Sequence, residues 1–119
     1  MKSVIWISRH RMTDDQLCDL ERIAGERVNI LQCKDTLKDL RRLQPLLRHV
    51  DIVAAVLPLD LLAELRQMAG DTPVLVSVSR REPTGRMRSL PDGGEEPEFR
   101  FVHAGWEQVV ELQLVTKML

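Results

Sequence analysis

The 119-residue sequence contains few of the residues that small proteins use in place of a large core. It has two cysteines, Cys18 and Cys33, which are too few and too far apart for a zinc knuckle or a Cys-x-x-Cys redox site. Both fall inside predicted helices or strands, so we interpret them as residues of the core or its boundary. A chain of this length can bury one core without disulfide bonds or metals.

Long apolar runs and a strong excess of either charge are also missing. No stretch approaches the roughly 18 apolar residues that a membrane span requires. The N-terminal apolar segment is interrupted by charge after about five residues, which is too early for a signal peptide. The formal net charge of −1 argues against nucleic-acid binding through overall basicity. We therefore expect a cytoplasmic protein with no membrane and no duplex nucleic acid among its partners.

Several catalytic signatures are absent as well. No Gly-x-Gly-x-x-Gly follows the first predicted strand, and there is no Gly-Lys-Ser/Thr phosphate loop, which argues against an ordinary NAD enzyme or P-loop nucleotidase. No Gly-x-Ser-x-Gly nucleophile elbow occurs either. The histidines His10, His49 and His103 are scattered and form no spaced ligand pair, so we predict neither a metal site nor a cofactor.

Strand-like and helix-like segments alternate through the first two thirds of the chain. Apolar runs predict strands, and apolar residues at helical spacing predict helices. The expected strands are 2–8, 28–33, 50–57 and 74–79, and the expected helices are 14–24, a segment from Asp35 or Thr36 to about Arg48 that kinks or restarts at Pro45, and 59–69. This order predicts an α/β fold, a compact, Rossmann-like, three-layer domain whose parallel sheet is built from three βα units. The apolar strand 50–57 should lie at the sheet centre and 28–33 near an edge.

The pattern changes after Ser79. Residues 80–97 are rich in glycine, proline and charge, and residues 91–94 predict a turn, so we interpret this stretch as a long, mobile hairpin connection. Its first half is rich in arginine and its second half in acidic residues, which can pair across a hairpin. We expect a strand at 99–102, antiparallel to the fourth, and a last half-exposed edge strand at 106–116. All of this belongs to one domain, residues 1–119.

The candidate site lies between the first strand and the first helix. Thr13 and Gln16 have the types and spacing of a capping box, and the loop before them carries Arg9, His10 and Arg11. Loops that follow parallel strands converge at the carboxyl edge, where open α/β sheets bind ligands. We therefore expect other loop residues to join the site: Ser8, the Asp35-Thr36 turn, Pro58, Ser79, Arg80 and Arg81. A cluster of positively charged side chains at this edge is suited to binding phosphate or another anion.

Structural roles stay open for the same residues. Capping alone accounts for Thr13 and Gln16, and His10 can bond to a neighbouring loop. Arg80 and Arg81 can be solvated charges of the hairpin. The alternative to ligand binding is a non-catalytic interaction protein, whose contact surface is the charged hairpin 80–98 together with the last strand.

The order His10-Arg11-Met12-Thr13-x-x-Gln16-Leu17, directly after an apolar strand, resembles a segment of some small, stand-alone CRISPR-associated proteins. That segment reads Ser-His-x-Leu-Thr-x-x-Gln and opens a compact Rossmann-like (CARF-type) fold. The resemblance implies a homodimer that binds a cyclic oligoadenylate across its subunit interface, either as a sensor or, if it also cleaves the ligand without a metal, as a ring nuclease. His10, Thr13 and Gln16 match the motif, whereas Arg9 replaces its serine and Ser8 lies one residue earlier.

The implied chemistry is possible with these residues. The 2′-hydroxyl of a ribose can attack the adjacent phosphate, so the protein need only hold the sugar in line and stabilise charge. Arg9, Arg11 and Arg80 can stabilise the charge, and His10 can protonate the leaving oxygen. We thus assign catalysis to His10, Arg9 and Arg11. The expected ligand-binding residues are Ser8, Thr13, Gln16, Pro58, Ser79, Arg80 and Arg81.

Overall fold

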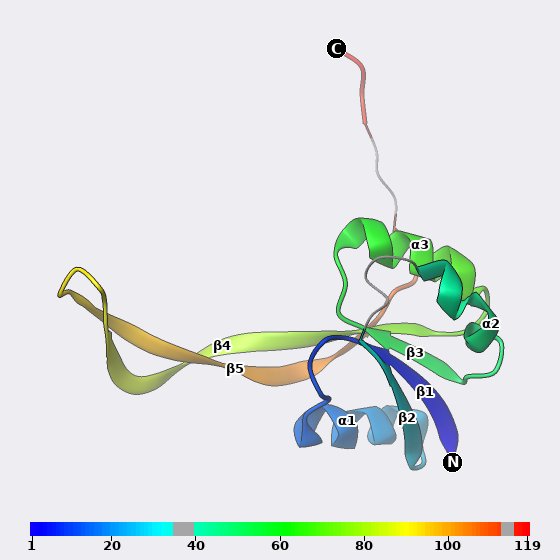
Figure 1. Ribbon diagram of the computed structural model, residues 1–119, viewed down its shortest axis with the longest axis horizontal. Coiled ribbons are helices and arrows are strands. Elements are labelled where there is room, and N and C mark those ends of the chain that lie inside the picture. Colours follow the sequence, from blue (N-terminus) through cyan, green and yellow to red (C-terminus); the bar gives the residue numbers. More distant parts are fainter. Residues whose placement is uncertain (35–39, 113–115) are drawn as a thin grey trace.

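The computed structural model describes residues 1–34, 40–112 and 116–119 and has an α/β architecture (Figure 1). The strands are β1 (Lys2–Ile7), β2 (Val28–Cys33), β3 (Ile52–Ala55), β4 (Val74–Ser89) and β5 (Glu95–Gln108). The helices are α1 (Asp14–Ala24), α2 (Gln44–Leu47), preceded by the 3₁₀ turn η1 (Leu40–Leu43), and α3 (Leu59–Ala69). Asp35 and Thr36, expected to begin the second helix, lie outside the described residues.

The five strands form one sheet in the order β2-β1-β3-β4-β5. β1 to β4 run parallel, and β5 is antiparallel to β4. As expected, β3 lies at the centre and β2 at an edge. The chain moves outward from β1 to β2 and then crosses back to β3, so the direction of winding reverses between β1 and β3. Such a reversal is where doubly wound sheets open a ligand crevice.

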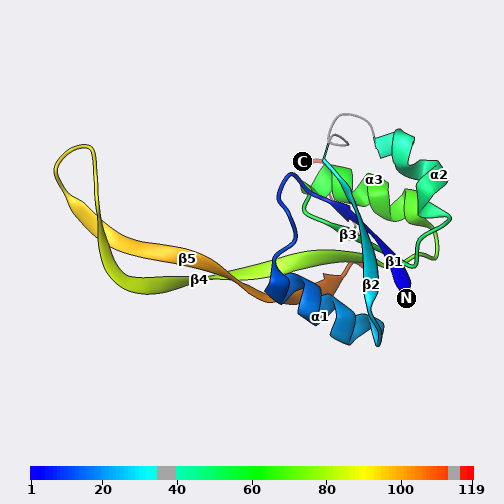
Figure 2. The same ribbon diagram turned by 60° about the horizontal axis from the view of Figure 1, so that its bottom comes forward.

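Both faces of the sheet are covered, which accounts for the uninterrupted apolar runs of its inner strands. Figures 1 and 2 show α1 on one face and α2 and α3 on the other. Successive residues of β1 point to opposite faces. Val4 and Trp6 pack with Leu20 on the α1 side, whereas Ile5 and Ile7 belong to the cluster on the α2 and α3 side.

The predicted helix boundaries in α1 and α3 are confirmed. The Thr13 side chain accepts a hydrogen bond from the Gln16 backbone N–H at 3.1 Å, and the Gln16 side chain accepts from the Thr13 N–H at 2.8 Å. Gly25 ends α1 in the left-handed conformation and donates its backbone N–H to the Glu21 carbonyl at 2.9 Å, which is the αL type of helix end. Pro45 lies in the first turn of α2, so the helix restarts there, as expected.

The prediction for residues 80–97 needs correction. β4 does not end at Ser79 but continues to Ser89, paired with β5 from Leu75 opposite Gln108 out to Ser89 opposite Glu95. β3 pairs only with residues 74–76 of β4. α1 contacts the ribbon at Ser77, His103 and Trp106, and the outer part of the ribbon projects from the domain (Figure 1). We call residues 79–103 the arm. The radius of gyration, 17.4 Å, exceeds the roughly 13.5 Å of a compact chain of this length.

Charge pairing across the two strands helps to explain why a stretch with a loop-like composition forms regular structure. Arg88 pairs with Glu96, and Arg100 lies 3.7 Å from Glu82. The first is a pair of the expected kind, an arginine of the first half with an acidic residue of the second, whereas the second joins a glutamate of β4 to an arginine of β5. Exposed pairs of this kind contribute little individually, so the ladder of backbone hydrogen bonds remains the main support of the ribbon.

The prediction of a last strand at 106–116 is correct only for residues 106–108, which belong to β5. β5 ends at Gln108, and the Val109 N–H donates to the Val74 carbonyl at 2.8 Å. Val74 is the first residue of β4, so residues 110–112 lie past the start of that strand and do not pair with it. Residues 110–112 are accordingly not strand, and 113–115 lie outside the described residues.

Candidate functional site

A cleft of about 330 Å³ lies at the carboxyl edge of the sheet, where β1, β2 and β3 end. Ser8, Lys34 and Val56 each directly follow one of these strands. The cleft is lined by Ile7, Ser8, Arg9, His10, Cys33, Lys34, Val56 and Pro58. It therefore includes the reversal point between β1 and β3, the expected ligand position in an open α/β sheet.

The loop that forms one wall of the cleft is fixed through its backbone. The buried Trp6 donates its indole N–H to the His10 carbonyl at 2.9 Å. The Gln32 side-chain amide, from β2, donates to the same carbonyl at 3.0 Å and to the Ser8 carbonyl at 3.2 Å. Ser8 Oγ accepts from the His10 N–H at 3.1 Å. With its backbone held, the loop leaves the Arg9 and His10 side chains exposed.

The charge of the cleft is positive. Arg9 and Lys34 are cations, and none of the described lining residues is acidic. Pro58 stands at the N-cap of α3 and provides no side-chain hydrogen bond to the first turn, whose N–H groups favour an anion. Asp60, in that same turn, partly offsets this field. The cleft can thus hold an anionic group, with Ile7, Val56 and Pro58 as apolar surface beside it.

Cys33 is the one cysteine in the cleft lining, and it is poorly suited to nucleophilic chemistry. Burial raises the pKa of its thiol above the ordinary value, so the reactive thiolate is disfavoured. Among the described residues, no group of three histidine, cysteine or acidic side chains is placed to hold a metal ion. The described lining residues that remain available for polar chemistry include His10 and the two cations Arg9 and Lys34.

The structure brings together four of the predicted site residues: Ser8, Arg9, His10 and Pro58. Arg11 is exposed and does not line the cleft. Thr13 and Gln16 form the cap of α1, and the Gln16 amide also donates to Ser77 Oγ at 3.0 Å. These three lie away from the cleft lining.

Ser79, Arg80 and Arg81 do not line the cleft either. β4 runs on through these positions, so they lie along the arm, opposite His103, Val102 and Phe101 respectively. Their expected place at the carboxyl edge depended on a strand end at Ser79, which the extended pairing removes. The Asp35-Thr36 turn lies outside the described residues.

Sequence reasoning missed Cys33, Lys34 and Val56 as lining residues. The available signal was their place in the chain, because the last residue of a parallel strand and the residue after it lie at the carboxyl edge. Lys34 follows β2 and Val56 follows β3. Lys34 could have been identified from the predicted strand end at Cys33, whereas Val56 could not, because the third strand was predicted to run to residue 57 and ends at Ala55.

Comparisons with protein-family models, with curated proteins and with solved structures found no match. The function therefore has to be inferred from the geometry of this chain. None of the described helices is long and apolar enough to cross a bilayer.

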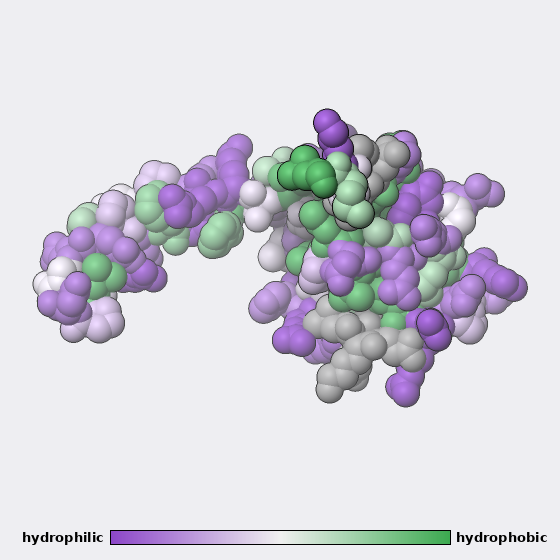
Figure 3. Space-filling model, turned by 90° about the horizontal axis from the view of Figure 1, so that it is seen from above, coloured by the Kyte–Doolittle hydropathy of each residue, from purple (hydrophilic) through white to green (hydrophobic). Residues whose placement is uncertain are grey.

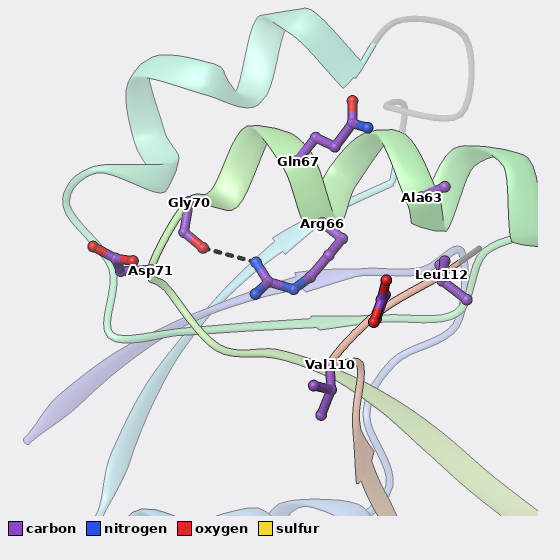
Figure 4. Close-up of a pocket in the computed structure, with 8 residues that line it drawn as sticks. Ala63, Arg66, Gln67, Gly70, Asp71, Val110 and Leu112 are labelled. Atoms are coloured by element: carbon purple, nitrogen blue, oxygen red, sulfur yellow. Dashed lines mark hydrogen bonds between the residues drawn. The ribbon is translucent and has the colours of Figure 1, made fainter.

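A larger hollow, of about 440 Å³, lies between α3 and the segment after β5 (Figure 4). The cation among its lining residues is Arg66, whose guanidinium donates to the Gly70 carbonyl at 2.7 Å. This hydrogen bond caps the C-terminal end of α3. The carboxylates of Asp71 and Glu111 also line the hollow. Acidic groups repel anions, so we place the candidate site at the carboxyl-edge cleft instead.

Proposed function

We propose that the carboxyl-edge cleft binds a small anionic ligand of nucleotide type. The observation that carries this proposal is the convergence of Arg9, His10 and Lys34 on a hollow at the reversal point of the sheet. Its volume, about 330 Å³, falls at the lower end of the range of small-molecule sites. The doubly wound strand order supports assigning the domain to the Rossmann-like class, in which nucleotides bind at this edge.

The lining residues divide into two kinds. Arg9 and Lys34 supply charge for a phosphate, and the first turn of α3 adds backbone N–H groups. Val56 and Pro58 supply apolar surface for a base or sugar. A nucleotide has both an anionic and a flat apolar part, so it fits this division better than an inorganic anion does.

In its finer form, the ligand is a cyclic oligoadenylate that is cleaved without a metal. The resemblance of residues 10–17 to the ring-nuclease motif supports this form, as does the presence of Ser8 and His10 in the same cleft. The ribose 2′-oxygen would form a bond to phosphorus while its proton passes to solvent, and the bond to the 5′-oxygen would break. His10 would protonate that leaving oxygen and Arg9 would stabilise the charge on phosphate, leaving a 2′,3′-cyclic phosphate end.

Thermal unfolding with linear and cyclic nucleotides tests the binding proposal. A ligand present at about 100-fold excess over its Kd adds roughly 2.7 kcal/mol to the stability of the folded state and raises Tm. Arg9→Ala and Lys34→Ala should abolish the shift. Arg27→Ala is the matched control, because this exposed arginine precedes β2 at the opposite edge of the sheet. Absence of a shift with every nucleotide would refute the proposal.

Turnover requires a separate assay. Cyclic oligoadenylate is incubated with the protein in excess chelator, and linear products with a 2′,3′-cyclic phosphate are sought by chromatography. His10→Ala should slow cleavage by about 100-fold or more, the usual loss for a general acid, while ligand-induced stabilisation remains. Binding without cleavage would leave a sensor function and eliminate the ring-nuclease form.

A further inference from the structure

The arm has one apolar face. Pro97, Phe99 and Phe101 alternate along β5 and therefore share a face, and their partners across the ribbon are Met87, Pro83 and Arg81. The Arg81 guanidinium lies over the Phe99 ring, 4.0 Å from its centre. Phe101, Met87 and Phe99 are 75%, 57% and 40% exposed. The chain has two phenylalanines, and both lie exposed on this face.

The opposite face of the arm is charged. Arg80, Glu82, Arg88, Glu96 and Arg100 alternate with the apolar positions, and they form ion pairs along and across the ribbon. Figure 3 looks onto the α3 side of the molecule, and hydrophilic residues predominate on the arm in that view. A strand pair that is apolar on one side and charged on the other is the pattern of a sheet with one packed face.

Within the monomer, only the base of the apolar face is packed. His103 continues the alternation of Phe99 and Phe101 and contacts Asp19 of α1, and Trp106 donates to the Gln16 carbonyl of the same helix. The apolar face is thus the side of the sheet that α1 covers. Farther out, where the arm projects beyond α1 (Figure 2), Phe101 and Phe99 are exposed. A two-stranded ribbon without a packed face is marginal in water.

Charge is distributed unevenly along the arm. The base, residues 79–83 and 99–103, carries three arginines and one glutamate, for a formal charge of +2. The outer part, residues 84–98, carries two arginines and four acidic residues, for a formal charge of −2. The whole arm is neutral, with a positive base and a negative tip.

We propose that the apolar face of the arm packs against the same face of a second copy of this chain, with the two arms antiparallel. A two-fold axis presents the same patch from both subunits, so Phe99, Phe101 and Met87 of each arm are covered by those of the other. In this arrangement the acidic tip of one arm lies over the basic base of its partner. The charge distribution therefore favours the antiparallel pair and disfavours the parallel one.

The same features select a second copy over other occupants. A neutral arm lacks the excess of cations that binding to nucleic-acid phosphates needs. The acidic tip would meet repulsion at an anionic membrane surface, and the phenylalanines lie back from that tip. Aromatic, methionine and arginine side chains are the residues enriched at protein–protein interfaces.

The first test is the oligomeric state of the full chain, measured by sedimentation over a range of micromolar concentrations. The wild type should show twice the 13.7 kDa mass of one chain. Phe99→Ser with Phe101→Ser should raise the dissociation constant by about 30-fold or more, the loss expected at an interface hot spot. Val110→Ser, which changes a side chain off the arm that is also 75% exposed, should leave the dimer intact.

The second test addresses the antiparallel arrangement. Arg81→Glu and Glu95→Lys, both on the apolar face, should each weaken the dimer, and the double variant should recover it. These positions lie far apart within one arm, since Arg81 faces Phe101 and Glu95 faces Ser89, so recovery reports a contact between arms. A monomeric wild type, a dimer unaffected by the serine pair, or arm-dependent binding to RNA or vesicles instead of self-association would overturn the proposal.

Discussion

Nε2 of His103 lies 2.8 Å from Oδ2 of Asp19, and this contact ties the base of the arm to α1. Trp106 supports the same junction, because its indole N–H donates to the Gln16 carbonyl at 3.1 Å. Its ring also meets that of Trp6 edge-on, with the centroids 5.7 Å apart. Trp6 in turn holds the loop of the cleft through the His10 carbonyl. One chain of contacts therefore connects the arm, α1 and the cleft.

Asp19→Asn should lower the free energy of unfolding at neutral pH by about 1.5 kcal/mol, the typical contribution of a hydrogen bond to a charged group. The hydrogen bond from His103, followed by that from Arg22, holds the pKa of Asp19 below its ordinary value. The unfolded chain then binds the proton more tightly than the folded one. The stability that the Asp19 carboxylate contributes is therefore fully present above the ordinary aspartate pKa of about 4. It is lost as the pH falls through the lower pKa that Asp19 has in the folded protein.

Urea unfolding of the wild type and Asp19→Asn at about pH 5.5 and about pH 3 checks this sign. The difference between the two proteins should shrink at the lower pH. A difference that stays constant or grows on acidification would show that Asp19 does not stabilise the fold as a carboxylate.

Thr13→Ala should cost about 1 kcal/mol of stability, because the N-cap side chain that accepts from the Gln16 N–H is lost. Chemical unfolding monitored by circular dichroism measures the change. Ser89→Ala is the control, since it removes an exposed hydroxyl at the end of β4, outside any helix cap. Equal effects of the two substitutions would argue against the capping role.

Trp6→Phe and Trp106→Phe form a matched pair that separates the cleft from the arm. Each substitution removes one indole N–H, and each should destabilise the fold by about 1 kcal/mol or more. The lost bond of Trp6 leads to the His10 carbonyl, so only this variant should weaken the nucleotide binding that we propose for the cleft, by about tenfold. Calorimetric titration provides the comparison, and equal weakening by both variants would contradict the proposed link between Trp6 and the cleft.

The two cysteines should differ in reactivity. Cys18 is exposed, whereas burial raises the pKa of the Cys33 thiol, so iodoacetamide should modify Cys18 first. Peptide mass spectrometry over a time course resolves the two sites. In urea, where burial is lost, the rates should become similar; faster modification of Cys33 in the folded protein would indicate an activated thiol in the cleft.

Much of the fold is predictable from short stretches of sequence, because the interactions involved are local. The capping box joins Thr13 and Gln16, which are three residues apart. Gly25 ends α1 and Pro58 begins α3 because of their own backbone preferences. The apolar runs of β1 and β3 reflect burial on both faces, which needs no knowledge of the partner strand. These features identified the α/β class and the loop that carries Arg9 and His10.

The arm and the lining of the cleft depend on contacts between distant parts of the chain. Glycine, proline and charge predicted a loop after Ser79, yet β4 continues because β5 offers it a partner as far as Glu95. That pairing moves Arg80 and Arg81 away from the carboxyl edge, where Lys34 and Val56 lie instead. Strand length depends on whether a partner's backbone is available to satisfy each N–H and C=O group, and only the folded chain supplies that partner.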